Sequence, residues 1–134
     1  MKLNEKINCS VGILTLNCGD TIERCLESLK DFREIIICDG NSTDNTLEIA
    51  KKYDVKIIKQ YDSDEPNLRC VKDKANVRQK NMNAATYDWY FFMDADDILP
   101  VETIKEIRQI VNNDSEFSIY KMPTKIIINS KIIN

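Results

Sequence analysis

Short apolar runs alternate with amphipathic helical stretches along this chain, and the alternation limits the folds that it can adopt. Residues 10–16 and 34–38 are rich in the aliphatic and β-branched side chains of buried strands. Between them, the apolar residues from Ile22 to Leu29 recur at positions i, i+3, i+4 and i+7, which is the core-facing stripe of a helix. A strand, a helix and a second strand in this order are typical of a unit with parallel strands.

The same alternation continues along the chain. We expect further strands at residues 55–59, 89–93 and 117–122, and further helices at residues 42–53, 74–85 and 100–111. Residues 60–73 predict a long surface loop, and residues 125–134 (KIIINSKIIN) predict a hairpin or an edge strand. A chain of 134 residues is one domain at most. The order of elements predicts an α/β fold whose mostly parallel sheet carries helices on both faces.

Two of the predicted helices have recognisable start signals. Residues 20–23 (DTIE) have the form of a capping box with Asp20 in the first position. Ser42 or Thr43 can cap the helix that runs to about Tyr53. We therefore expect side chains at these positions to bind the first backbone N–H groups of their helices.

Polar residues follow three of the predicted strands at the point where each strand ends. These residues are Thr15 and Asn17, residues 39–44 (DGNSTD) and residues 94–97 (DADD). The carboxyl ends of parallel strands share one edge of a sheet, and ligands bind in the crevice beyond that edge. The three groups should therefore converge on one ligand. Because they include several carboxylates, a bare anion is unsuitable as that ligand.

The composition excludes several kinds of active site. The chain has no histidine, which removes Ser-His-Asp and Cys-His catalysis and HExxH zinc sites. Its three glycines form neither a GxGxxG motif nor a P-loop. A net charge of −3 gives no electrostatic reason to expect nucleic acid as a partner. A phosphate ligand would therefore be held through Mg²⁺ or Mn²⁺, and a D-x-D pair at a strand end suits that role.

The cysteines indicate a reducing compartment. Their number, five, is odd, and no CxxC motif occurs. Cys25 and Cys38 sit in apolar patterns, so we expect them to be small buried hydrophobic residues. The apolar run near the start is too short to span a membrane. We therefore expect no membrane span and a cytoplasmic location, either free or peripheral at the inner face of the membrane.

Three segments of the chain resemble a known family. They are VGILTLNCGDTIERCLESL (11–29), EIIICDGNSTDNTLEIAKKYDVKII (34–58) and VRQKNMNAATYDWYFFMDADDILP (77–100). Together they are similar to the family 2 glycosyltransferases of the GT-A fold, and the similarity runs from about Ser10 to about Val111. Each motif alone is weak, since a D-x-D is common, but these three different motifs in the right order, each at a strand end, are specific.

The resemblance implies a Rossmann-like GT-A nucleotide-diphospho-sugar transferase fold and a nucleotide-sugar donor, often UDP-linked. It places Thr15 and Asn17 near the nucleoside, Asp39 against the base, Arg78 near the base and phosphates, Asp94 against the ribose or the metal's waters, and Asp96 on the metal. The implied reaction is a metal-assisted sugar transfer, with inversion, to an acceptor that is a saccharide, a lipid-linked saccharide or a protein.

The resemblance covers the donor-binding half of the family, and no catalytic base is identified in this chain. We therefore expect residues 1–134 to be one nucleotide-sugar-binding domain without the acceptor-binding half. The alternative is a truncated, non-catalytic nucleotide-sugar-binding module that acts with a partner chain or is a gene remnant, and homo-oligomers are left open. A phosphoacceptor receiver domain would need an acidic pair at the end of the first strand, where Thr15-Leu16-Asn17 supplies none.

Overall fold

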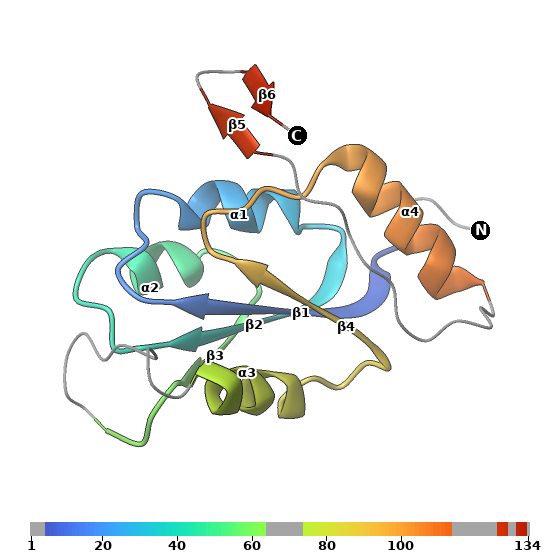
Figure 1. The fold of residues 1–134 in the computed structure, drawn as a ribbon. Helices are drawn as coiled ribbons and strands as arrows, with labels where there is room; N and C mark the ends of the chain where they lie inside the picture. Colours follow the sequence, from blue (N-terminus) through green and yellow to red (C-terminus); the bar gives the residue numbers. More distant parts are fainter. Residues whose placement is uncertain (1–4, 64–73, 114–125, 129–130, 134) are drawn as a thin grey trace.

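A computed structural model describes residues 5–63, 74–113, 126–128 and 131–133 of the chain (Figure 1). The strands are β1 (Ile7–Thr15), β2 (Phe32–Asp39), β3 (Lys56–Lys59), β4 (Trp89–Asp94), β5 (Ile126–Ile128) and β6 (Lys131–Ile133). The helices are α1 (Ile22–Ser28), α2 (Thr46–Ala50), α3 (Lys74–Asn83) and α4 (Val101–Asn112). The predicted strand at 117–122 and residues 64–73 of the predicted loop lie outside the described residues.

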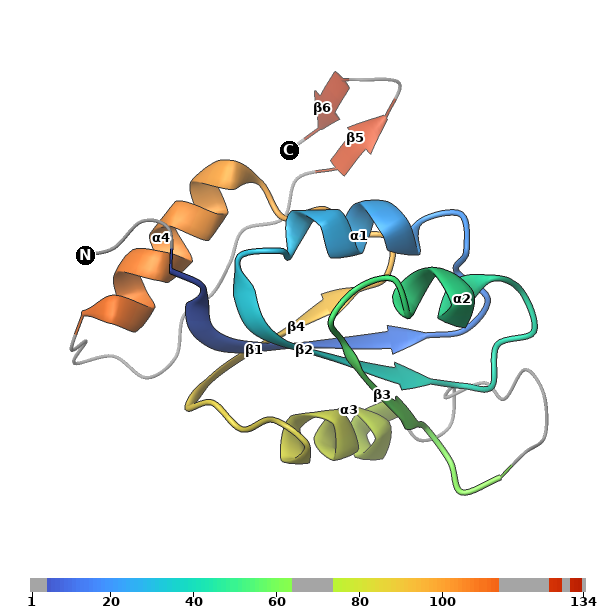
Figure 2. The ribbon, with the colours of Figure 1, turned by 180° about the vertical axis from the view of Figure 1, so that it is seen from behind.

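The main sheet has the strand order β3-β2-β1-β4, and all its strands are parallel. Helices α1, α2 and α4 cover one face of this sheet, and α3 covers the other (Figures 1 and 2). The predicted parallel sheet with helices on both faces is confirmed. The chain leaves the sheet at β3 and returns through α3 to β4, on the far side of β1. The topological switch point, where such folds bind ligands, therefore lies between β1 and β4.

The hydrophobic core lies between the sheet and the helices on the side of α1. Val11 and Ile13 of β1, Ile37 of β2 and Leu26 of α1 are all 0% exposed. Cys25 and Cys38 are also fully buried, as predicted. Burial raises the pKa of the Cys25 thiol to about 12, so this side chain is protonated and packs as a small apolar group.

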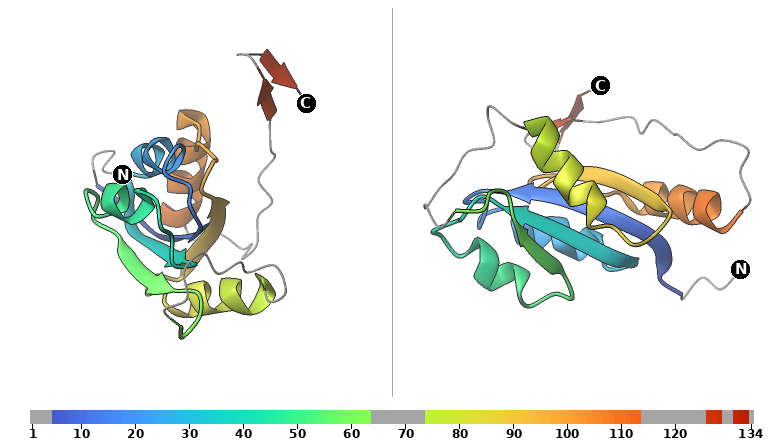
Figure 3. Two further views of the ribbon diagram at one scale, coloured as in Figure 1. Left: turned by 90° about the vertical axis from the view of Figure 1, so that its left-hand side faces the viewer. Right: turned by 90° about the horizontal axis from the view of Figure 1, so that it is seen from below.

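Helix α3 lies on the opposite face of the sheet (Figure 3), and polar contacts join it to the strands. Asn81 of α3 is fully buried, and its Nδ2 donates to the carbonyl oxygens of Ile13 at 3.4 Å and Ile36 at 3.0 Å. The Tyr90 hydroxyl donates to Asn81 Oδ1 at 2.8 Å. The predicted polar helix at 74–85 is therefore present, and it is attached to the sheet through the buried amide of Asn81, beside the buried side chain of Val77.

Gly12 makes room for these contacts at the centre of β1. A Cβ atom at this position would collide with the Tyr90 hydroxyl and with Asn81 Oδ1. We expect Gly12→Ala to lower the free energy of unfolding by about 2–4 kcal/mol, because overpacking adds to the loss of a buried hydrogen bond. Urea denaturation measures this loss. Tyr90→Phe, which removes the hydroxyl without adding an atom, should cost only about 1 kcal/mol. Equal losses for the two variants would contradict the steric explanation.

The two predicted helix caps are wrong. Helix α1 has Thr21 as its N-cap, without a side-chain hydrogen bond to the helix, so Asp20 forms no capping box. Helix α2 begins later than predicted, with Asn45 as its N-cap. Ser42 instead donates to a carboxylate at the end of β2, since that buried acceptor is a stronger partner than an exposed helix end.

Strands β5 and β6 pair antiparallel, which confirms a hairpin within residues 125–134. Every helix in the described ranges is too short or too polar to cross a lipid bilayer.

Candidate functional site

The carboxyl ends of β1, β2 and β4 meet at one edge of the sheet. Thr15 is the register partner of Asp39, and Leu14 is the register partner of Asp94. The Thr15 hydroxyl donates to Asp39 Oδ1 at 2.6 Å, which joins the two strand ends directly. These strand ends meet at one edge of the sheet, as predicted, and the edge includes the switch point between β1 and β4.

Asp39 is a buried carboxylate with several hydrogen-bond donors around it. Its exposed fraction is 4%. Besides Thr15, the Ser42 hydroxyl donates to Asp39 Oδ1 at 2.6 Å and the Ser42 backbone N–H donates to Oδ2 at 2.8 Å. A buried charge is tolerated only where such donors hold it, so this side chain is fixed in one orientation.

Gln60, the residue directly after β3, supports the same strand ends and was not predicted from the sequence. Its Nε2 donates to the carbonyl oxygens of Thr15 and Cys38, each at 3.1 Å, and its backbone N–H donates to the carbonyl oxygen of Asp39 at 2.9 Å. The side chain is 4% exposed, and its Oε1 has no partner among the described residues. A polar residue directly after a predicted strand was the signal that could have identified it.

Asn17 joins two loops at this edge. Its backbone has a φ of 48°, a left-handed conformation that asparagine tolerates well. Its Oδ1 accepts hydrogen bonds from the backbone N–H groups of Thr43 at 2.8 Å and Asp44 at 3.3 Å. Asn17 therefore shapes the loop after β1 against the loop after β2, in addition to any contact with a ligand.

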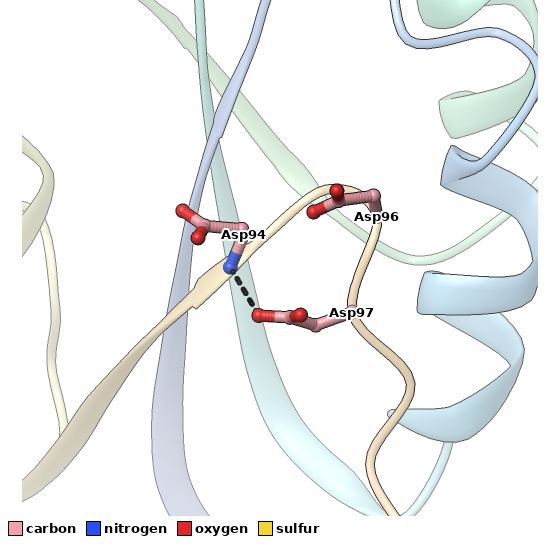
Figure 4. A group of neighbouring side chains, drawn as sticks. All are labelled: Asp94, Asp96 and Asp97. Atoms are coloured by element: carbon pink, nitrogen blue, oxygen red, sulfur yellow. Dashed lines mark hydrogen bonds between the residues drawn. The ribbon is translucent and has the colours of Figure 1, made fainter. Parts of the chain in front are cut away.

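Three carboxylates gather at the end of β4 (Figure 4). Asp94, Asp96 and Asp97 are exposed, and each has an oxygen within 4.8 Å of the others. A tight turn produces this arrangement: the Asp97 N–H donates to the Asp94 carbonyl at 3.1 Å, and the Asp94 N–H donates to Asp97 Oδ2 at 3.3 Å. Asp97 therefore closes the turn that presents the other two side chains.

The carboxylate cluster carries an electrostatic cost. The partial burial of the Asp97 carboxyl raises its pKa. The hydrogen bond from the Asp94 backbone partly offsets this, and repulsion from Asp94 and Asp96 raises the pKa further. A divalent cation would relieve this repulsion, and carboxylate oxygens are the ligands that Mg²⁺ and Mn²⁺ prefer. The donor set and its spacing thus fit such an ion.

Arg78 of α3 lies beside the cluster. A cavity of about 290 Å³ is lined by Arg78, Phe92, Asp94 and Asp97. The guanidinium carbon of Arg78 stands 4.8 Å from the centre of the Phe92 ring. Within residues 5–63 and 74–113, no carboxylate is at salt-bridge distance from Arg78. The pocket therefore combines acidic groups with a guanidinium whose N–H donors are available to an anion.

The fold and this edge of the sheet define a GT-A-type α/β domain with its site at the switch point. The chain belongs to the glycosyl transferase family 2, because the model for that family matches residues 10–125. It is 33% identical over 109 residues to the SPbeta prophage-derived glycosyltransferase SunS of Bacillus subtilis (strain 168). That match covers 81% of this chain and 24% of SunS, so the chain spans about a quarter of this curated relative.

Solved structures agree with this assignment. S. aureus TarS (residues 1–349), solved with UDP, superposes with a TM-score of 0.62 at 28% identity, over 77% of this chain and 31% of TarS. Glucosyl-3-phosphoglycerate synthase from Mycobacterium tuberculosis, solved with Mn²⁺, UDP and phosphoglyceric acid, gives a TM-score of 0.55 at 25% identity. This second match covers 70% of this chain and 34% of the synthase.

Proposed function

We propose that this chain binds a UDP-linked sugar together with Mg²⁺ or Mn²⁺ and forms the donor-binding part of a glycosyltransferase. The observation that carries the proposal is the pocket that joins Arg78 to the carboxylates of Asp94 and Asp97, at the same sheet edge as buried Asp39. A metal-bound diphosphate needs both carboxylates and a cation. The UDP and Mn²⁺ in the related structures support this choice of ligand.

Asp39 is the proposed contact to the nucleobase. An ionised carboxylate offers about four lone-pair positions. Thr15 and Ser42 use three of them through the bonds described above. The remaining position, on Oδ2, suits an N–H donor such as N3–H of uracil. Asn17 keeps its proposed place near the nucleoside, where it shapes the loop.

The proposed metal ligands are Asp96, directly, and Asp94, directly or through water. Both are exposed at the turn, whereas Asp97 Oδ2 is engaged with the Asp94 backbone. When bound, the ion would neutralise the charge that develops on the diphosphate as the sugar leaves. Arg78 would contact the same diphosphate through its N–H groups.

The complete reaction that we propose is attack by an acceptor hydroxyl on the anomeric carbon of the sugar, with inversion and release of the nucleoside diphosphate. No residue is assigned as the base that takes the hydroxyl proton. We propose a cytoplasmic location and treat residues 1–134 as one donor-binding domain. A binding module that acts with a partner chain is the second candidate. Turnover of a UDP-sugar by this chain, followed by NMR, separates the two.

Nucleoside diphosphates should differ in how strongly they stabilise the chain in the presence of Mn²⁺. We expect UDP to raise the melting temperature more than CDP, because cytosine has no N3–H to donate to Asp39. A ligand at 100 times its Kd stabilises a protein by about 2.7 kcal/mol, which a thermal shift assay detects. Equal shifts for UDP and CDP would contradict the role of Asp39, and no shift with any nucleoside diphosphate would contradict the proposed function.

A further inference from the structure

We infer that Phe92, together with the Asn81–Tyr90 pair, positions the Arg78 guanidinium in the cavity that it shares with Asp94 and Asp97. In this position the guanidinium would meet the diphosphate of the donor. The inference rests on the proposed function. It assigns positioning roles to side chains of the third motif to which the sequence analysis gives no role. Its basis is the way in which α3 is set against β4.

Strand alternation places the relevant β4 side chains on one face. Successive residues of a strand point to opposite faces of the sheet. Phe91 packs against the core on the α1 side. Tyr90 and Phe92 contact α3 on the other side, through Asn81 and Arg78. Asp94 follows on this same face, so the strand leads from the α3 contacts directly to the carboxylates.

Two contacts set helix α3 in register with β4. Asn81 Oδ1 accepts the hydrogen bond from Tyr90 at 2.8 Å, and the Arg78 guanidinium lies over Phe92 at 4.8 Å. On the helix the two residues are three positions apart and share a side, and on the strand their partners are two positions apart. Arg78 is therefore the member of this pair nearer the carboxyl end of the strand, beside Asp94.

The Asn81–Tyr90 contact fixes the position of α3 along β4, because the same Asn81 amide also donates to backbone carbonyls of β1 and β2. It is fully buried and donates to the carbonyl oxygens of Ile13 and Ile36. Arg78, by contrast, is exposed, and a long side chain in water loses rotamer freedom when it binds a ligand. The face of Phe92 attracts the guanidinium and holds it near the pocket before the ligand arrives, which lowers that cost.

The test compares UDP with uridine, which has the same base and ribose but no phosphate. In the presence of Mn²⁺, Phe92→Leu should weaken UDP about 3- to 20-fold and leave uridine binding unchanged, because only the phosphate contact depends on Arg78. NMR titration measures both affinities. Phe92→Tyr keeps the aromatic face and should retain the affinity for UDP. Tyr90→Phe, which removes one hydroxyl, should weaken UDP in the same selective way.

Phe91→Leu is the matched control, since it makes the same change on the opposite face, where Phe91 packs edge-on against Phe32 at 5.3 Å. It should lower stability without changing the ratio of UDP to uridine affinity. An unchanged ratio in both Phe92→Leu and Tyr90→Phe would overturn this inference alone. A wild-type chain that binds no UDP with Mn²⁺ would overturn the proposed function and this inference with it.

Discussion

Replacing Asp96 with alanine is expected to weaken UDP binding in Mn²⁺ by about 100-fold or more, because a metal on a phosphoryl oxygen contributes several kcal/mol. Asp96 is exposed at the turn after β4, and its carboxylate takes no part in the hydrogen bonds that close this turn. The substitution should therefore remove a metal ligand and leave the fold intact. Calorimetric titration with UDP at fixed Mn²⁺ gives the affinity.

Asp88→Ala is the matched control for Asp96→Ala. Asp88 is an exposed aspartate immediately before β4, at the opposite end of the strand from the cluster. Asp88→Ala changes the net charge by the same amount as Asp96→Ala, so the comparison corrects the UDP affinity for the effect of net charge. UDP affinity in Asp88→Ala should equal that of the wild type. The metal assignment would be contradicted by equal affinities in Asp96→Ala and Asp88→Ala.

Replacing Asp39 with alanine is expected to destabilise the chain by about 3 kcal/mol, since hydrogen bonds to charged groups contribute about 1.5–3 kcal/mol and their donors are left unsatisfied. The donors are the Thr15 hydroxyl and two groups of Ser42, all at 2.6–2.8 Å from the carboxylate. For a domain of this size the melting temperature should fall by roughly 10–20 °C. Calorimetric or spectroscopic melting measures the change.

Thr15→Val provides the comparison for Asp39. It removes one donor and leaves the carboxylate with its contacts to Ser42. We expect a loss of about 1 kcal/mol, the net value of one hydrogen bond. A loss below about 0.5 kcal/mol in Asp39→Ala, the range of ordinary surface substitutions, would show that the carboxylate is not the centre of this network.

The sheet and its ligand edge could be predicted because their signals are local. Aliphatic runs such as residues 34–38 are long enough to mark a buried strand, and β2 is found there. Once the strands are parallel, their carboxyl ends must share an edge, so Thr15, Asp39 and Asp94 could be placed together without coordinates. The rule that parallel strands end at one edge of the sheet thus allowed the position of the site to be predicted from local signals.

The missed features depend on contacts between distant parts of the chain. Ser42 has the local signature of a helix cap, but the buried carboxylate of Asp39 takes its hydroxyl. Gln60 bonds to residues 45 and 22 positions away, at Thr15 and Cys38. Asn81 on a polar helix carries no local sign that it is buried, because its partners are backbone carbonyls of the sheet. Tertiary contacts of this kind leave no periodic pattern.

Calorimetry with UDP in the presence and absence of Mn²⁺ tests most directly whether the carboxylate cluster at the end of β4 binds a nucleotide diphosphate through a metal. We predict that UDP binds in the presence of Mn²⁺ and that a chelator weakens this binding by about 100-fold. Adding Mg²⁺ or Mn²⁺ in excess of the chelator should restore the affinity. The same UDP affinity with and without the chelator would contradict it.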